Sequence, residues 1–305
     1  MRIFDMGNDF HEIKESEMKS DGTYWICTFV SDLRDIHEKF SLKEEVVIEC
    51  EKFNKATKIE YYNDYIFLIL NILEYYNEGV HSRELYIFLG KNFIITSFKE
   101  ELDLLNNFLL DINSYKNCSM LKENPRPTIM FYYILDRIIL KNYNAISVMG
   151  EEGDKIEIRI LKNPKHEILY ELIHLRRQLY KLRKYLNPLR YIGDSLENND
   201  NGVIEEAYIK IFKVLNKKIV KLMLSLESLS GDMASVRQAY EAEISNKTNE
   251  LMKAFTLIAT VFLPLNLITS IMPFNDYKYI YYFIIIFMLI TSYLLMKFFK
   301  RKKWL

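Results

Sequence analysis

The feature that most constrains this 305-residue chain is a pair of long uncharged runs near its C-terminal end. No charged residue occurs from Ala254 to Asn275 or from Tyr279 to Met296, runs of 22 and 18 residues. As helices rising about 1.5 Å per residue, they would reach roughly 33 and 27 Å, which is close to the hydrocarbon thickness of a bilayer. A buried hairpin of a soluble protein is the alternative, but buried soluble helices are seldom uncharged for so long. The two runs therefore predict a transmembrane hairpin.

The charges around the hairpin predict its orientation. The two runs are joined by a short link, so the chain returns to the side from which it entered. The tail KFFKRKKWL is rich in lysine and arginine, which favours the cytoplasmic side. The first residues contain no apolar signal-peptide core, and Cys27, Cys50 and Cys118 show no paired spacing, which suits a reducing compartment. We expect a multi-pass plasma-membrane protein with both termini cytoplasmic and the lipid bilayer as a partner.

The residues before the hairpin predict a mixed α/β domain. The chain has 41 basic and 41 acidic residues, so its overall charge gives no sign of nucleic-acid binding. We expect residues 1–20 to be loosely ordered, Thr23–Val30 to form a strand, and Ser31 to cap the following helix. A turn at 90–92 between two apolar stretches predicts a β-hairpin. The segment GEEGD at 150–154 is expected to be a turn rather than a phosphate-binding loop.

Two later segments carry apolar residues at alternating steps of three and four, which is typical of helices packed along a seam. The first set is Ile168, Leu172, Leu175, Leu179, Leu182, Leu186 and Leu189, and the second is Leu215, Ile219, Leu222, Leu226, Leu229, Met233, Val236 and Tyr240. The second arm is expected to run from Ile204 to Met272, over about 100 Å. Because a lone helix of that length cannot bury its stripe, we expect copies of the chain to associate.

These segments together predict the organisation of the chain. It consists of a cytoplasmic α/β domain at 1–160, an antiparallel stalk helix and acidic tip at 161–203, a long stalk helix at 204–253, a pore-lining first span at 254–273, an outer loop at 274–278, a second span at 279–299 and a basic cytoplasmic tail at 300–305. The fold class is an α+β domain followed by long stalk helices and a two-span hairpin.

Polar and small residues of the first span recur on one helical face. This stripe comprises Asn249, Met252, Thr256, Ala259, Leu263, Asn266 and Ser270. Because an amide in hydrocarbon loses its water hydrogen bonds, Asn266 should face a bundle interior or a water-filled path. The alternative is that Asn266 and Thr269 only hold helices together. A ring of neutral oxygens can hydrogen-bond the waters of a cation, and magnesium suits it because that ion releases its waters reluctantly.

The segment SNKTNELMKAFTLIATVFLPLNLI at 245–268 resembles the membrane-entry segment of the CorA family of divalent-cation channels, and KKWL resembles the family's C-terminal end. Weaker similarity covers most of the chain, including KATKIEYYNDYIFLIL and YYILDRIILKNY. The resemblance implies a funnel-shaped homopentamer without a cofactor, whose transported ion is magnesium or another divalent cation. It places Asn249, Met252, Phe255, Ala259, Leu263 and Asn266 along the pore. This set differs from the polar stripe at one turn, where it has Phe255 instead of Thr256. The resemblance also implies a basic ring at the inner membrane face. That ring is Lys300, Arg301, Lys302 and Lys303.

Two departures from the family pattern concern selectivity and regulation. At the outer mouth, where the family has Gly-Met-Asn, this chain has Pro273, Phe274 and Asn275. The resemblance assigns Asn275 to the hydrated ion, but proline forbids conformations that glycine allows, so the loop must differ. The alternative role of Asn275 is to cap a turn. Where several members have stalk carboxylates that sense magnesium, this chain has lysines, which cannot bind a cation. They are Lys210, Lys213, Lys217, Lys218 and Lys221.

The functional alternatives differ in what crosses the membrane. No nucleophile–base pair or histidine spacing predicts catalysis, so the chain is not expected to be an enzyme. The main prediction is a channel for magnesium uptake, with cobalt or nickel as further ions, driven by the membrane potential. The alternatives are a transporter of the same fold tuned to zinc or another divalent ion, and a membrane scaffold or sensor that does not conduct.

Overall fold

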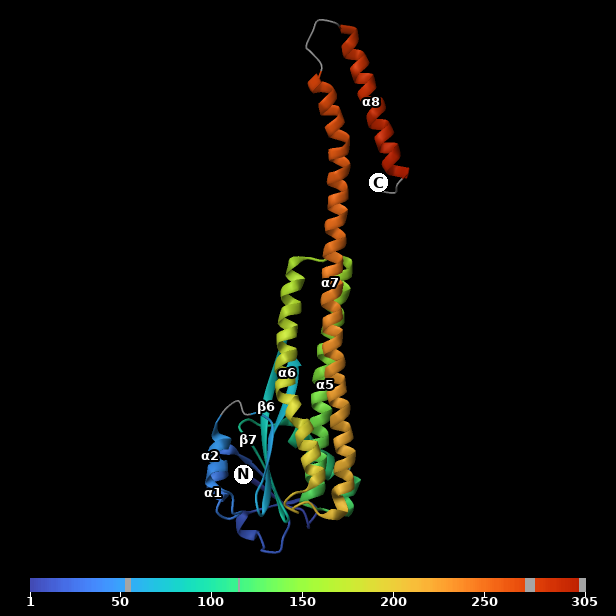
Figure 1. The fold of residues 1–305 in the computed structure, drawn as a ribbon. Coiled ribbons are helices and arrows are strands. Elements are labelled where there is room, and N and C mark those ends of the chain that lie inside the picture. Colours follow the sequence, from blue (N-terminus) through green and yellow to red (C-terminus); the bar gives the residue numbers. More distant parts are fainter. Residues whose placement is uncertain (53–55, 115, 272–277, 302–305) are drawn as a thin grey trace. The chain divides into compact units, whose positions relative to one another are not determined.

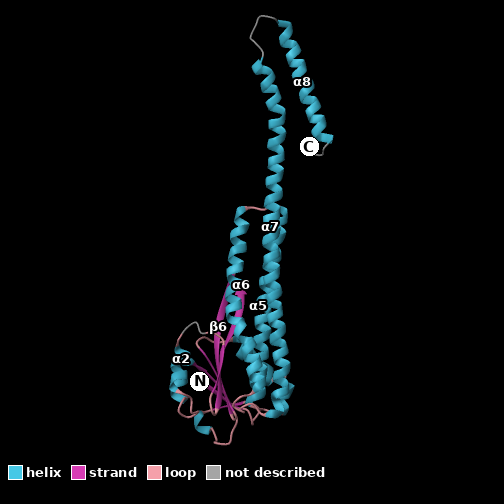
Figure 2. Cartoon of the chain, viewed as in Figure 1, coloured by secondary structure: helices cyan, strands magenta, loops and turns pink. Residues whose placement is uncertain are grey.

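The structure, a computed structural model, describes residues 1–52, 56–114, 116–271 and 278–301 (Figures 1 and 2). The chain forms two compact units, which are treated separately. The first unit contains Met1–Ile158 and His166–Val236, and the second contains Arg159–Lys165 and Arg237–Leu305. The helices are α1 (Leu33–Ile36), α2 (Glu44–Glu51), α3 (Asp103–Asn113), α4 (Ser119–Glu123), α5 (Pro127–Lys162), α6 (His166–Asn198), α7 (Ile209–Ile271) and α8 (Lys278–Arg301).

A mixed sheet forms the centre of the first unit, with the order β2-β1-β3-β7-β6-β5-β4 among the described residues. Its strands are β1 (Arg2–Asp5), β2 (His11–Ile13), β3 (Tyr24–Phe29), β4 (Lys58–Tyr61), β5 (Tyr65–Tyr76), β6 (Gly79–Gly90) and β7 (Phe93–Phe98). Strands β3 and β7 pair in parallel, whereas the other neighbours are antiparallel. The predicted strand at Thr23–Val30 and the hairpin around 90–92 are confirmed as β3 and the β6–β7 connection.

Helices cover both faces of the sheet because its strands are apolar on both sides. On one face, side chains such as Phe67 and Phe88 form a buried cluster with Leu33 of α1 and Val46 of α2. On the other face, Trp25 lies against helix α3, with its ring centroid 6.0 Å from that of Phe108. Figure 2 shows α2 on one side of the magenta strands and α5 and α6 on the other.

Asn142 of α5 completes the edge of the sheet beyond the end of β4. Among the described residues, strand β4 pairs only with Ile66–Ile69 of β5, and no other described strand lies beside the following residues of β5 on that side. The Leu73 amide donates to Asn142 Oδ1 at 2.8 Å, and Asn142 Nδ2 donates to the Asn71 carbonyl at 3.1 Å. The side chain is fully buried. Two backbone groups that would otherwise be buried without partners are therefore satisfied by one amide.

Helices α5, α6 and the first part of α7 pack along one seam. Every apolar residue predicted for the two stripes is buried, from Ile168 to Leu189 on α6 and from Leu215 to Tyr240 on α7. Helix α5 supplies the third side: a Cβ at Gly153 would lie only 2.1 Å from Met233 Cε and 3.8 Å from Leu175 Cδ2. The stripe from Leu215 to Val236 is thus buried within one chain, and the expectation that its burial needs further copies is wrong.

Three local expectations are also wrong. Residues 1–20 contain β1 and β2, which pair with each other and are joined by a bidentate ion pair between Arg2 and Glu12. The N-cap of α1 is Asp32, and the Ser31 hydroxyl donates to the Asp32 carboxylate instead of capping the helix. Residues 150–154 continue α5 without a turn, and Gly153 lies so close to Met233 of α7 that a side chain there would not fit without a shift.

Candidate functional site

The apolar part of α7 is a continuous helix that runs through Pro264 to Ile271. Within the described part of the chain, one helical stretch, Glu206–Leu267, is long and apolar enough to cross a membrane, and none of its most apolar window is buried. The predicted uninterrupted passage from the stalk into the first uncharged run is confirmed. Proline lacks a backbone N–H, so the carbonyl of Thr260 loses its usual helical donor at this point.

One face of this helix is partly covered inside the second unit. Its half-buried residues recur at helical spacing and are Leu257, Thr260, Val261, Pro264 and Leu265. Helix α8 has a corresponding stripe of half-buried or buried residues at Met288, Thr291, Ser292, Leu295 and Phe299. Each of the two helices therefore has one less exposed stripe, and most of its other described side chains are exposed.

The predicted polar stripe lies on the open side of α7. Asn249, Thr256, Ala259, Asn266 and Ser270 are exposed, and so are Met252, Phe255 and Leu263, with 59%, 66% and 67% of their surface accessible. At about 100° per residue, the centre of the stripe is roughly 140° from the centre of the covered face. The stripe and the covered face thus point in nearly opposite directions.

The hydroxyl groups of this part of α7 bond to the helix itself. Thr256 Oγ1 donates to the Met252 carbonyl at 2.8 Å, Thr260 Oγ1 to the Thr256 carbonyl at 2.7 Å, and Ser270 Oγ to the Asn266 carbonyl at 2.8 Å. Thr248, one residue before the predicted stripe, donates in the same way to the Ile244 carbonyl at 2.9 Å. The sequence placed Thr256 and Ser270 on the stripe but gave no direction for the hydrogens that their hydroxyls donate.

The remaining predicted site residues are only partly described. Lys300 and Arg301 are exposed in the last turn of α8, where two cations stabilise the helix C-terminus. Lys302 and Lys303 of the predicted basic ring lie outside the described residues. The same holds for Pro273, Phe274 and Asn275 of the predicted selectivity loop.

One of the stalk lysines, Lys218, forms an ion pair within the chain. Lys218 Nζ of α7 lies 2.5 Å from Asp136 Oδ1 of α5. Burial opposes the charge of Lys218, but the hydrogen bond and the negative charge of Asp136 raise its pKa. In the described residues, no group of three or more His, Cys, Asp or Glu side chains could hold a metal ion.

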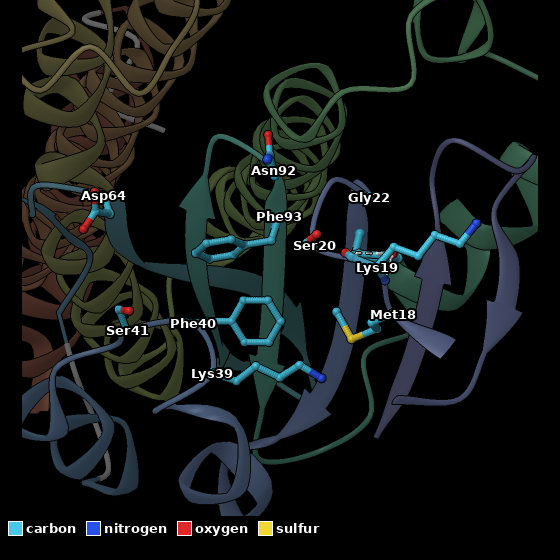
Figure 3. A pocket seen from close by; sticks show the side chains of 11 residues that line it. Met18, Lys19, Ser20, Gly22, Lys39, Phe40, Ser41, Asp64, Asn92 and Phe93 are labelled. Carbon is cyan, nitrogen blue, oxygen red and sulfur yellow. Dashed lines mark hydrogen bonds between the residues drawn. The ribbon is translucent and has the colours of Figure 1, made fainter. Parts of the chain in front are cut away.

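A hollow of about 400 Å³ in the first unit is an alternative candidate site. Figure 3 shows Lys19 and Lys39 at its border, with Phe40 and Phe93 forming an aromatic wall. The ring centroids of the two phenylalanines are 4.9 Å apart. Asp64 is the single carboxylate among its lining residues, which include neither histidine nor cysteine. This hollow does not have the ligands of a cation site or a nucleophile with its base.

Comparison with known proteins decides the family. The sequence profile described as "CorA-like Mg2+ transporter protein" matches residues 20–301. The chain belongs to this CorA family. The cobalt/magnesium transport protein CorA of Thermotoga maritima is 25% identical over 280 residues, 88% of this chain and 79% of that protein. The zinc transport protein ZntB of Vibrio parahaemolyticus is 24% identical over 110 residues, 36% of this chain and 34% of that protein.

Solved structures show the same fold. The CorA magnesium transporter from Methanocaldococcus jannaschii superposes with a TM-score of 0.82 at 16% identity, covering 100% of this chain and 98% of that one. The predicted α/β domain followed by a long helix is therefore confirmed as a CorA fold. Membership in a family of ion transporters also agrees with the expectation that this chain is not an enzyme.

Proposed function

We propose that this CorA-family chain assembles into a homopentameric channel for divalent metal cations and that it takes up magnesium. Helices α7 and α8 form a two-span hairpin with both chain termini in the cytoplasm. Five copies of α7 surround a central water-filled path, and α8 lies on the outside. The transported ion needs no resident cofactor, since the protein acts through its pore lining.

The observation that carries this proposal is the division of α7 into a covered face and an open polar stripe. The half-buried residues from Leu257 to Leu265 point away from the stripe that contains Thr256, Asn266 and Ser270. A polar side chain within a membrane is more stable next to water or protein than next to hydrocarbon. Five stripes that meet around an axis place these side chains next to water, whereas the covered face packs within the hairpin.

The driving force is electrical. A cation with two charges gains about 4.6 kcal/mol on entering a cell with a potential of 100 mV, negative inside, because each elementary charge contributes about 2.3 kcal/mol. Uptake therefore requires no nucleotide hydrolysis. We propose that Asn275 contacts the hydrated ion at the outer mouth and that Lys300, Arg301, Lys302 and Lys303 surround the inner end of the path.

Zinc is the second candidate ion. It is supported by the sequence similarity to the zinc transport protein ZntB and by the presence of Pro273 and Phe274 where the family pattern has glycine and methionine. A loop of different geometry presents different oxygen atoms to the ion, and ion choice depends on such details.

The test is flux through the full-length protein in liposomes. A potassium diffusion potential of defined size drives entry, an internal magnesium-sensitive dye reports it, and cobalt, nickel and zinc serve as competitors. We expect potential-dependent magnesium entry that is abolished in Asn275→Ala. Asn246→Ala is the matched control, because Asn246 is an exposed amide of α7 outside the polar stripe.

The possible results separate the candidates. Zinc entry without magnesium entry would transfer the proposal to the second ion. Absence of flux for every divalent cation would refute the channel and leave a membrane scaffold. Full activity of Asn275→Ala would refute the role of that amide while leaving transport itself established.

A further inference from the structure

The two hydroxyl groups on the polar stripe have no hydrogen left for an outside partner. Thr256 Oγ1 lies 2.8 Å from the Met252 carbonyl, and Ser270 Oγ lies 2.8 Å from the Asn266 carbonyl. A carbonyl oxygen only accepts, so each hydroxyl must donate its single hydrogen to the helix. What each group presents away from the helix is an oxygen with free lone pairs. Both side chains are exposed.

This arrangement distinguishes a hydrated cation from a hydrated anion. Water bound to a cation turns its oxygen toward the ion and its hydrogens outward, so the shell donates hydrogen bonds to its surroundings. Water bound to an anion does the opposite and needs donors around it. A lining whose hydroxyls only accept therefore satisfies the outer side of a cation's shell and leaves an anion's shell without partners.

The rest of the stripe does not supply charge selection. Residues 254–275 contain no carboxylate that would attract cations and no lysine or arginine that would repel them. Met252, Ala259 and Leu263 carry no hydrogen-bond donor. The amides of Asn249 and Asn266 carry both donors and acceptors, so they do not favour one sign of charge.

We infer that Thr256 and Ser270 are specificity-determining residues that select hydrated cations over hydrated anions through the fixed direction of their hydroxyl hydrogens. This inference rests on the proposed function, since it requires the stripe to line a water-filled path.

The chain offers matched controls for this inference. Thr260 Oγ1 donates to the Thr256 carbonyl at 2.7 Å, and Thr291 Oγ1 of α8 donates to the Phe287 carbonyl at 2.7 Å. These two hydroxyls have the same internal bond, but both side chains are half-buried. Their removal changes the same intrahelical interaction without changing the proposed path.

The experiment compares isosteric variants of the full-length protein in planar bilayers under a magnesium chloride gradient. Thr256→Val and Ser270→Ala remove stripe hydroxyls, Thr260→Val and Thr291→Val remove control hydroxyls, and Thr256→Ser retains the hydroxyl. The conductance and the reversal potential, which gives the ratio of magnesium to chloride permeability, are measured for each. We expect the permeability ratio to fall roughly fivefold in each stripe variant, the size of one hydrogen bond, and to stay unchanged in the controls and in Thr256→Ser.

The possible results separate a failure of this inference from a failure of the proposed function. A wild-type protein that conducts no ion refutes the channel and, with it, this inference. A conducting wild type whose stripe and control variants share one permeability ratio overturns the inference alone. Size-exclusion chromatography of each variant in detergent shows whether it retains the wild-type assembly, and Ser270→Ala supplies the decisive result if Thr256→Val fails to assemble.

Discussion

Replacement of Asn142 by leucine should destabilise the first unit strongly. The amide of Asn142 is the partner of the Leu73 N–H and the Asn71 carbonyl, at 2.8 and 3.1 Å, and it is fully buried. Leucine removes both bonds and leaves two buried backbone groups unsatisfied. Each such group costs about 1–3 kcal/mol, so the free energy of unfolding should fall by about 2–6 kcal/mol.

The matched control is Asn144→Leu on the same helix. Asn144 is exposed, so this variant makes the same change in helix propensity, about 0.5 kcal/mol, without losing a buried bond. Thermal unfolding of the full-length protein in detergent can be followed through the fluorescence of Trp25, which is buried against the sheet. For a unit of this size, 1 kcal/mol corresponds to roughly 2–4 °C, so Asn142→Leu should lower the midpoint by at least about 4 °C relative to the control. Equal midpoints for the two variants would refute the role of Asn142 at the sheet edge.

Three further predictions concern the path, a surface carboxylate and a buried thiol. Asn266→Leu should reduce divalent flux while the oligomer in detergent stays intact; dissociation would show instead that the amide holds helices together. The hydrogen bond from Lys141, assisted by Arg83, lowers the pKa of Glu74 despite partial burial. The ionised Glu74 carboxylate therefore stabilises the folded state at pH values above its unfolded-state pKa. This contribution is lost as the pH falls through the lower folded-state pKa. Glu74→Gln should accordingly lower the unfolding midpoint at pH 7, and its difference from the wild type should disappear once the pH is below the lowered folded-state pKa of Glu74. Burial raises the pKa of the Cys50 thiol, so iodoacetamide should label it only after unfolding, as mass spectrometry can show.

Strong periodic patterns made much of the fold predictable. Residues that favour strands indicated β3, a turn between two apolar stretches indicated the β6–β7 hairpin, and steps of three and four located the buried residues of α6 and α7. These signals are local because each depends on side chains that repeat along one element. The polar stripe of α7 was visible for the same reason, since residues such as Thr256 and Asn266 share a face through helical spacing alone.

The features that the sequence did not show depend on contacts between distant segments. Gly150 and Gly153 suggested a turn, but both lie within α5, and Gly153 lets this helix approach Met233 of α7. The sequence did not show that α5 is long enough to cover the α7 stripe, so burial of this stripe was predicted to need other copies of the chain. The short strand β1 was missed because its register is set by β2 and β3 rather than by a pattern of its own. The directions of the hydroxyl hydrogens likewise follow from backbone geometry that the sequence does not state.

The closed seam of α5, α6 and the first part of α7 has a consequence for biosynthesis. Its apolar residues find all their neighbours within residues that the ribosome makes before the uncharged runs begin. Domains fold as units while the remainder of a chain is still being synthesised. The first unit can therefore mature early, and membrane insertion and the joining of subunits become later, separate events.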